Sequence, residues 1–175
     1  MTQPRSQPIC TADLYDAHPE SLQVSTLQFR SFGQRPSFWG EVETLTTFED
    51  HTPVLKAVST PGNGRVLVVD AGGSMRVGVM GDRLAGIAAD NGWVGVVING
   101  LIRDSVGINA VDIGVKALGT TARRGWVATD GQRGTEIAFG ALRIAPGDWA
   151  YCDEDAVMIS RDFLDVETQS PPAPV

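Results

Sequence analysis

The chain has 175 residues, 42% of them hydrophobic and 20% charged, a composition typical of a globular domain that buries about two thirds of its unfolded surface. Its net charge of −7 argues against direct nucleic-acid binding, which normally needs a basic face. No apolar run approaches the ~20 residues of a membrane span, and no apolar signal segment opens the chain, so we expect a soluble cytoplasmic protein with reduced cysteines.

Two short helices and one strand are predicted in the N-terminal third. Residues 1–10 are expected to form a flexible lead. A helix is predicted over Thr11–Ala17, with Thr11 as its cap. Residues 37–48 alternate between polar and apolar, most clearly over 41–45, which indicates a half-exposed strand. A second helix is predicted over Thr52–Val58, because Pro is favoured in the first turn of a helix.

The central part of the chain is predicted to form a strand, a glycine turn, a helix and a second strand. Residues 65–70 and 93–98 are short apolar runs rich in β-branched residues, typical of strands buried on both faces. Glycines between 71 and 74 break the first run and predict a tight turn. Apolar residues at helical spacing predict a helix over 83–89, and Asn99-Gly100 is expected to end the second strand.

Three charged residues lie at the ends of these elements, at positions where ligands often bind. Asp82 fits the N-cap of the helix over 83–89, so the free N–H groups of that first turn are suited to an anion such as a carboxylate. Arg103 and Asp104 come just after the second buried strand, at the end where open α/β sheets usually place their ligands. We expect a candidate site where these segments meet.

The C-terminal part is predicted to be mostly strands. Residues 115–121 read as a strand, and residues 122–134, with three arginines and three glycines, as a mobile or ligand-facing loop. A hairpin (135–139 and 142–144) and two short strands (149–152 and 156–159) are predicted next, and then a disordered tail over 168–175. The whole pattern indicates one α/β domain over residues 11–167, built as a mixed sandwich.

The motifs Gly81-Asp82-Arg83-Leu84, Asn99-Gly100-Leu101-Ile102-Arg103-Asp104 and Asp112-Ile113-Gly114 resemble the family of the regulator of ribonuclease E activity A (RraA-like). That family includes the metal-dependent 4-hydroxy-4-methyl-2-oxoglutarate aldolases. The resemblance covers roughly residues 11–166 and implies a β-β-α sandwich of the swivelling-domain type. The spacing of Asp82, twenty intervening residues and the Arg103-Asp104 pair is its most specific feature.

The resemblance implies a carbon–carbon lyase that cleaves 4-hydroxy-4-methyl-2-oxoglutarate and decarboxylates oxaloacetate, both through a pyruvate enolate. Asp104 is the expected ligand of a divalent cation, Mg²⁺ or Mn²⁺, which acts as a Lewis acid. Arg103 is expected to bind the oxyanion or the oxo-acid end of the substrate, and Asp82 to accept the C4 hydroxyl proton. The substrate carboxylate is expected at the backbone N–H groups of Gly81, Asp82, Arg83 and Leu84.

Two further expectations concern assembly and the metal shell. The resemblance implies a homotrimer or a dimer of trimers with the site near a subunit boundary, and some members of the family bind and inhibit a ribonuclease. Many members carry an acidic residue three positions after the Arg-Asp pair, where this chain has Gly107. We therefore expect the outer metal shell to differ, with a carboxylate from a neighbouring subunit as its replacement.

Four alternatives stay open at this point. Asp82 can be a structural N-cap and nothing more, with Arg103 and Asp104 as surface charges. A Schiff-base aldolase would use Lys56 or Lys116, although nothing in the sequence marks either lysine as having a depressed pKa. A closed zinc site lacks a ligand cluster, and we interpret His18 and His51 as surface or capping residues. A non-catalytic regulator that inhibits ribonuclease E is the alternative function, since the acidic net charge suits a basic partner.

Overall fold

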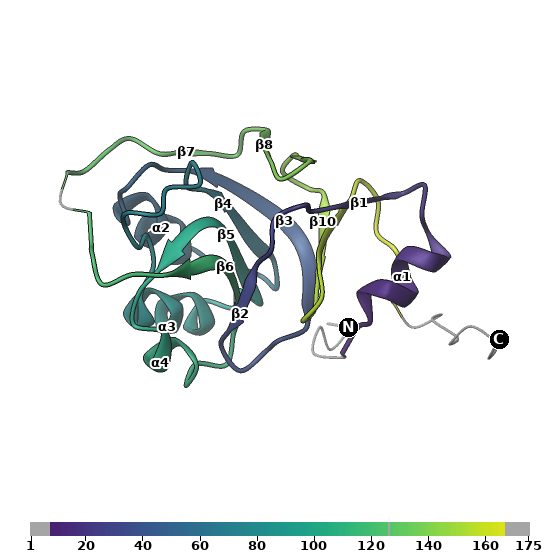
Figure 1. Cartoon of the computed structure of the whole chain (residues 1–175), viewed down its shortest axis with the longest axis horizontal. Helices are drawn as coiled ribbons and strands as arrows, with labels where there is room; N and C mark the ends of the chain where they lie inside the picture. The colour runs from purple at the N-terminus through teal and green to yellow at the C-terminus, as the bar shows by residue number, and fades with distance from the viewer. Residues whose placement is uncertain (1–7, 126, 167–175) are drawn as a thin grey trace.

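Two apolar strands, β4 (Val66–Asp70) and β5 (Gly95–Ile102), lie at the centre of a nine-stranded sheet, and all of their residues except Asp70 are buried. The computed structural model describes residues 8–125 and 127–166 (Figure 1). The sheet order is β1 (Leu22–Val24), β11 (Val157–Ser160), β10 (Trp149–Cys152), β3 (Phe38–Thr46), β4, β5, β6 (Gly114–Thr120) and β2 (Arg30–Phe32), with β7 (Gln132–Arg133) paired to β3. The strands from β3 to β6 are parallel, so their C-terminal ends meet at one edge.

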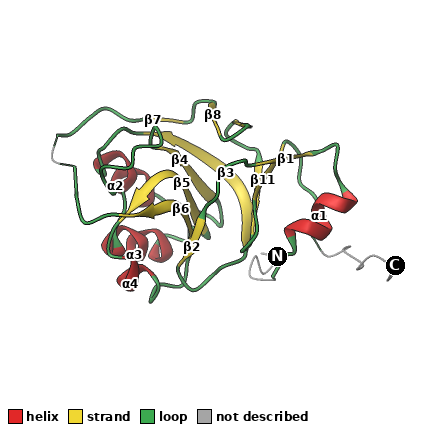
Figure 2. Ribbon diagram, viewed as in Figure 1, coloured by secondary structure: helices red, strands yellow, loops and turns green. Residues whose placement is uncertain are grey.

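Helices and a hairpin cover the sheet. The helices α2 (Thr52–Val58), α3 (Asp82–Asp90) and α4 (Ser105–Ile108) group together on one face, as Figure 2 shows. The hairpin of β8 (Ile137–Phe139) and β9 (Leu142–Ile144) packs against the other face, and α1 (Thr11–Ala17) packs on the strands β10 and β11. The predicted mixed α/β sandwich is confirmed. Within the described ranges, no helix is long and apolar enough to cross a membrane.

The second buried strand extends further than predicted. The Asn99-Gly100 pair was expected to end this strand, but β5 continues through it to Ile102. The pairing of β5 with β6 shifts register between Ile98 and Leu101, so the two turn-forming residues occupy a bulge. The side-chain amide of Asn99 donates to Asp70 Oδ1 at 2.9 Å and fixes the bulge to the end of β4. The prediction that Arg103 and Asp104 follow the strand end is confirmed.

The beginning of the chain also differs from expectation. Residues 1–7 of the predicted flexible lead, and the predicted tail over 168–175, lie outside the described residues. Ile9, however, is buried, and its N–H donates to Ser37 Oγ at 2.9 Å, so the end of the lead is packed. The N-cap position of α1 is held by Cys10 and not by Thr11. The strands β1, β2 and β7 were not predicted, because they are only two or three residues long and, unlike β8 and β9, pair with strands that are distant in the sequence.

Lys116 has a buried environment that the sequence does not mark. Its side chain is buried, and its ammonium donates hydrogen bonds to Ser31 Oγ, Pro36 O and Asp153 O at 2.6, 2.9 and 2.5 Å. Burial lowers the pKa of Lys116, partly opposed by the negative charges of Asp153 and Glu154 nearby. Nothing in the sequence marks this lowered pKa of Lys116, because it depends on burial in the folded chain. Because three acceptors hold the ammonium, Lys116 connects β6 to β2 and to the β10–β11 turn, and we interpret it as a structural residue.

Asp153 is a buried carboxylate that ties α1 to the turn between β10 and β11. It accepts hydrogen bonds from the Thr11 amide and hydroxyl, both at 2.7 Å, and from the amides of Asp155 and Ala156. Burial alone would raise the pKa of Asp153, but these hydrogen bonds favour the ionised form and hold the pKa below its usual value. The carboxylate therefore stabilises the fold above its unfolded pKa of ~3.9, and this contribution is lost as the pH falls through the lower folded pKa.

Asp153→Asn should lower the free energy of unfolding at pH 7 by roughly 1–3 kcal/mol, because an amide cannot accept all of these hydrogen bonds. The difference from wild type should shrink at pH 3, because the stabilisation by the ionised carboxylate begins to be lost below the unfolded pKa of ~3.9. Urea denaturation at both pH values measures this, with Asp155→Asn as the control at an exposed neighbouring carboxylate. An equal loss at both pH values would show that the charge of Asp153 is not what stabilises the fold.

Candidate functional site

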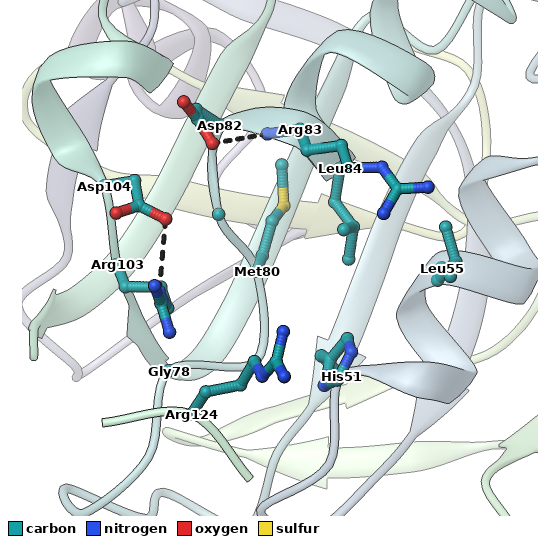
Figure 3. A pocket seen from close by; sticks show the side chains of 11 residues that line it. His51, Leu55, Gly78, Met80, Asp82, Arg83, Leu84, Arg103, Asp104 and Arg124 are labelled. Atoms are coloured by element: carbon teal, nitrogen blue, oxygen red, sulfur yellow. Dashed lines mark hydrogen bonds and ion pairs between the residues drawn. The ribbon is translucent and has the colours of Figure 1, made fainter. Parts of the chain in front are cut away.

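A small cavity of about 130 Å³ opens where the C-terminal end of β5 meets the beginning of α3 (Figure 3). This volume is well below the roughly 300–1,000 Å³ of pockets for drug-sized ligands, so the cavity suits a small substrate. All six residues predicted for the site lie in its wall. The lining consists of His51, Leu55, Gly78, Met80, Gly81, Asp82, Arg83, Leu84, Arg103, Asp104 and Arg124.

Backbone hydrogen bonds bring the two predicted motif segments together. The Val79 N–H donates to Leu101 O at 2.9 Å, and the Arg103 N–H donates to Met80 O at 2.9 Å. Residues 78–80 therefore run parallel to the end of β5 and pair with it. As a result, α3 begins beside Asp104, although about twenty residues separate the two segments in sequence.

Asp104 adopts a strained backbone conformation at the end of β5. Its φ of 55° and ψ of 42° lie in the left-handed region, which costs free energy for a residue with a side chain. Asp and Asn are the residues that adopt this conformation most readily after Gly. The turn points the Asp104 carboxylate back toward α3, where its Oδ2 accepts a hydrogen bond from Arg103 Nε at 3.1 Å.

The beginning of α3 differs in one detail from the prediction. The N-cap position is held by Gly81, and Asp82 is the first helical residue. The Oδ1 of Asp82 accepts a hydrogen bond from the Arg83 N–H at 2.7 Å, so this amide already has a partner. The first turn still faces the cavity, and Asp82 places a carboxylate in the same wall as Asp104.

Two glycines allow the two carboxylates to lie where they do. A Cβ on Gly81 would lie 2.9 Å from Asp104 Oδ2, and a Cβ on Gly107 would lie 2.6 Å from Asp82 Oδ2 and 2.7 Å from Asp82 Cβ. Contacts below 3.0 Å force a shift, so α3 and α4 approach this closely only with glycine at both positions. The metal shell was expected to differ at Gly107. In the structure, the Asp82 side chain occupies the space that a side chain at position 107 would need.

The charges around the cavity suit an anionic ligand together with a cation. Arg83, Arg103 and Arg124 contribute positive charge, and Asp82 and Asp104 contribute negative charge. The Arg103–Asp104 ion pair is partly solvent-exposed, with 33% and 45% of the two side chains accessible, so its own contribution to stability is small. Within the described ranges, no group of three or more His, Cys, Asp or Glu side chains could hold a metal ion. Mg²⁺ needs only one or two carboxylates and otherwise keeps its waters, and the partly exposed carboxylate of Asp104 meets that requirement.

Asp112, from the third motif, and the buried Asp50 both form hydrogen bonds that hold the fold together. Asp112 forms two hydrogen bonds with the Arg35 guanidinium, at 2.7 and 2.8 Å, and this partner lowers the pKa of Asp112. Asp50 is buried and accepts hydrogen bonds from the amides of Thr52 and Thr129 at 2.9 and 2.6 Å. Asp50 therefore connects the beginning of α2 to the loop over 122–134.

Five residues of the cavity were not predicted as site residues, and two of them, His51 and Arg124, have polar side chains. His51 was interpreted as a surface or capping residue; it occupies the N-cap position of α2, but its half-buried side chain makes no cap hydrogen bond and lines the cavity. His18 occupies the C-cap position of α1, as that interpretation allows. Arg124 belongs to the loop that was predicted to be mobile or ligand-facing, and its position in the cavity wall favours the ligand-facing interpretation. Neither residue carries a local sequence signal, because only the folded chain brings them to Asp104.

A family model described as RraA-like (Aldolase/RraA) matches residues 11–159. Among curated relatives, a protein of Alkalilimnicola ehrlichii named "Putative 4-hydroxy-4-methyl-2-oxoglutarate aldolase" is 44% identical over 154 residues, which cover 88% of this chain and 96% of the relative. A protein of Shewanella oneidensis with the same name is 41% identical over 152 residues, 87% of this chain and 93% of the relative.

Two solved structures have the same fold. One is described as an S-adenosylmethionine:2-dimethylmenaquinone methyltransferase from Geobacillus kaustophilus; it has a TM-score of 0.86 and 43% identity, and covers 89% of this chain and 97% of its own. The other is described as the RNA-processing inhibitor RraA from Thermus thermophilis, with a TM-score of 0.85, 34% identity, and coverage of 91% and 96%.

Proposed function

This chain belongs to the RraA-like family, and we propose that it is a divalent-metal-dependent lyase that cleaves 4-hydroxy-4-methyl-2-oxoglutarate into two molecules of pyruvate and decarboxylates oxaloacetate. One observation carries the proposal: Asp82, Arg103 and Asp104 line a single small cavity that has the size and the charges for a dicarboxylic acid. The names of the curated relatives support the choice of substrate.

The proposed reaction needs negative charge to be stabilised on the keto oxygen. Asp104 would hold a Mg²⁺ or Mn²⁺ ion, which supplies Lewis-acid stabilisation at that oxygen. Arg103 presents a planar, permanently charged fork to the oxo-acid end of the substrate. The first turn of α3 faces the substrate carboxylate with its N–H groups, except for the Arg83 amide that Asp82 already occupies.

Asp82 is the proposed proton acceptor. It takes the proton of the C4 hydroxyl as the C3–C4 bond breaks, so that the oxygen becomes the carbonyl of the first pyruvate. The electron pair of the broken bond moves into the other half as an enolate, which becomes the second pyruvate when C3 takes up a proton. In oxaloacetate the same enolate forms when CO₂ leaves, and no hydroxyl proton has to be accepted.

A Schiff-base route has less support. The chain has two lysines, and both lie in other parts of the structure. Lys56 lines a separate cavity with Pro53 and Arg133, and Lys116 lines one with Phe29 and Glu154. Because an imine-forming amine must reach the keto carbon, neither lysine is placed to act at the cavity that holds Asp104.

The alternative function is a protein-binding regulator that inhibits ribonuclease E. The similarity to the Thermus RraA structure and the net charge of −7 favour this alternative. The methyltransferase description belongs to the Geobacillus protein. In this chain the glycine turn after β4 uses its amides within the fold: the Gly72 N–H donates to Asp70 Oδ1 and the Gly73 N–H donates to Asn99 O, both at 3.0 Å.

The experiment is to supply 4-hydroxy-4-methyl-2-oxoglutarate and oxaloacetate separately, with Mg²⁺, and to measure pyruvate with a coupled lactate dehydrogenase. The lyase proposal predicts enzyme-dependent pyruvate from both acids, and borohydride with pyruvate should label neither Lys56 nor Lys116. Inhibition of ribonuclease E without pyruvate release would establish the regulator instead. A borohydride-labelled lysine in an active enzyme would replace the metal route by the Schiff-base route.

We further propose a homotrimer, or a dimer of trimers, with each cavity near a subunit boundary. Large apolar side chains next to the site support an interface there, since Phe48, Met75 and Val127 are 55%, 62% and 76% exposed. Phe48 and Val127 line a neighbouring open groove that shares Arg124 with the cavity. Sedimentation equilibrium should give three or six times the chain mass of 18.6 kDa, and a fully active monomer would contradict the assembly.

A further inference from the structure

His51 is held firmly in the wall of the cavity by its neighbours in sequence. Asp50 O accepts a hydrogen bond from the Thr47 hydroxyl at 2.7 Å, and the Asp50 carboxylate accepts from the Thr52 amide and hydroxyl at 2.9 and 2.7 Å. The backbone on both sides of His51 is thereby fixed. Leu55, one helical turn later on α2, lines the same cavity, so both side chains project from one face of the helix.

Within the part of the chain that the structure describes, one nitrogen of the His51 imidazole makes no hydrogen bond that would hold the fold together. His51 Nδ1 is buried and has no hydrogen-bond partner among the described residues, although buried polar atoms in proteins are nearly always paired. The side chain does not cap α2, because Asp50 already satisfies the Thr52 amide. The His51 side chain lines the cavity, so a ligand bound there is the candidate partner that completes the hydrogen bonding of the imidazole.

The location of His51 indicates which part of a ligand it meets. Figure 3 shows His51 and Arg124 on one side of the cavity, and Asp104 and Asp82 across from them. The apolar side chain of Met80 lies between these polar groups, and Leu55 lines the cavity beyond His51. The cavity therefore has two polar ends, one with carboxylates for a cation and one with an imidazole and a guanidinium.

We propose that His51 hydrogen-bonds the carboxylate on C4 of the substrate, the half that leaves as the first pyruvate, and so acts as a specificity residue. The inference rests on the proposed lyase function, which assigns the oxo-acid end to Asp104 and Arg103. A substrate held there extends its C4 substituents toward the opposite end of the cavity. The carboxylate then reaches His51 and Arg124, and the C4 methyl group lies against Met80.

The two substrates should depend on His51 to different degrees. In 4-hydroxy-4-methyl-2-oxoglutarate the distal carboxylate stays ionised through the reaction, so a hydrogen bond to it is kept. In oxaloacetate the distal carboxylate is one carbon nearer to the keto group and must lose its charge as CO₂ departs. A hydrogen bond that favours the ionised carboxylate therefore assists the first reaction and gives little to the second.

The test compares His51→Leu, His51→Asn and wild type in kcat/KM for both acids. His51→Leu should lose roughly 10- to 100-fold with 4-hydroxy-4-methyl-2-oxoglutarate, the effect of removing one hydrogen bond to a charged group, and clearly less with oxaloacetate. His51→Asn should recover much of the loss, because its amide nitrogen can occupy the place of Nδ1. His18→Leu is the control at the other histidine. An equal loss for both acids, or no recovery by Asn, would assign His51 a structural role and leave the lyase function standing.

Imidazole resonances give a readout that does not need turnover, since the chain has only two histidines. Magnesium and 2-oxoglutarate, which keeps the five-carbon dicarboxylate backbone, should shift the ring signals of His51 and leave those of His18 unchanged. Shifted amides at 81–84 with an unchanged His51 ring would refute the inference alone. No shift in any signal at saturating ligand would contradict both the inference and the proposed class of substrate.

Discussion

Asp104→Asn is expected to reduce lyase turnover on the order of a thousandfold, because the loss of the proposed cation ligand removes several kcal/mol of transition-state stabilisation. Asn is the substitution that isolates the charge. It has nearly the same size, and it tolerates the left-handed conformation that Asp104 adopts with φ at 55°. Alanine at this position would add backbone strain and confuse the result.

The measurement pairs turnover with cation binding. Asp104→Asn should keep the thermal transition of wild type within a few degrees while Mn²⁺ binding, followed by electron paramagnetic resonance, is strongly weakened. Asp90→Asn removes the same charge from an exposed residue at the other end of α3 and should leave turnover unchanged. Wild-type turnover in Asp104→Asn at moderate Mg²⁺ would remove Asp104 from the mechanism.

Gly107→Ala should reduce turnover by about 10- to 100-fold, because the added Cβ would lie 2.6 Å from Asp82 Oδ2. The contact with Asp82 Cβ at 2.7 Å means that rotation of the carboxylate alone cannot relieve the overlap. The beginning of α3 must move away from α4, and the proposed base moves with it. Overpacking of this kind should also cost roughly 1–3 kcal/mol of stability.

Gly86→Ala is the matched control on the same helix. A Cβ at Gly86 meets nothing within 4 Å, so alanine should stabilise α3 by about 0.5–1 kcal/mol and leave turnover unchanged. Pyruvate release and urea denaturation of both variants give the comparison. Full activity in Gly107→Ala would show that the position of Asp82 is not critical, and the role of base would have to be reassigned.

The elements that the sequence predicted well are those whose own residues determine them. The apolar β-branched runs of β4 and β5 and the Pro in the first turn of α2 are local signals, and the structure contains each element. The Asn99-Gly100 pair misled the prediction because turn-forming residues also occupy bulges. Strands of two or three residues, such as β2 and β7, depend on pairing with distant partners and have no pattern of their own.

The residues of the candidate site also fall into those with a local sequence signal and those without one. Asp82, Arg103 and Asp104 were predicted because their spacing is a motif, and the structure places all three in one cavity wall. His51 and Arg124 come from α2 and from the loop after β6, so only tertiary packing brings them to this cavity. The lowered pKa of Lys116 likewise depends on burial among β2, β6 and the β10–β11 turn, which a sequence alone does not reveal.

The most direct test of the central claim is metal removal and replacement in one sample. The protein is treated with EDTA and desalted, and pyruvate release from 4-hydroxy-4-methyl-2-oxoglutarate is followed before and after Mg²⁺ is added. A metal-dependent lyase predicts almost no pyruvate from the stripped protein and full recovery on addition of Mg²⁺ or Mn²⁺. Full turnover by the metal-free protein, unchanged when Mg²⁺ is added, would contradict the account.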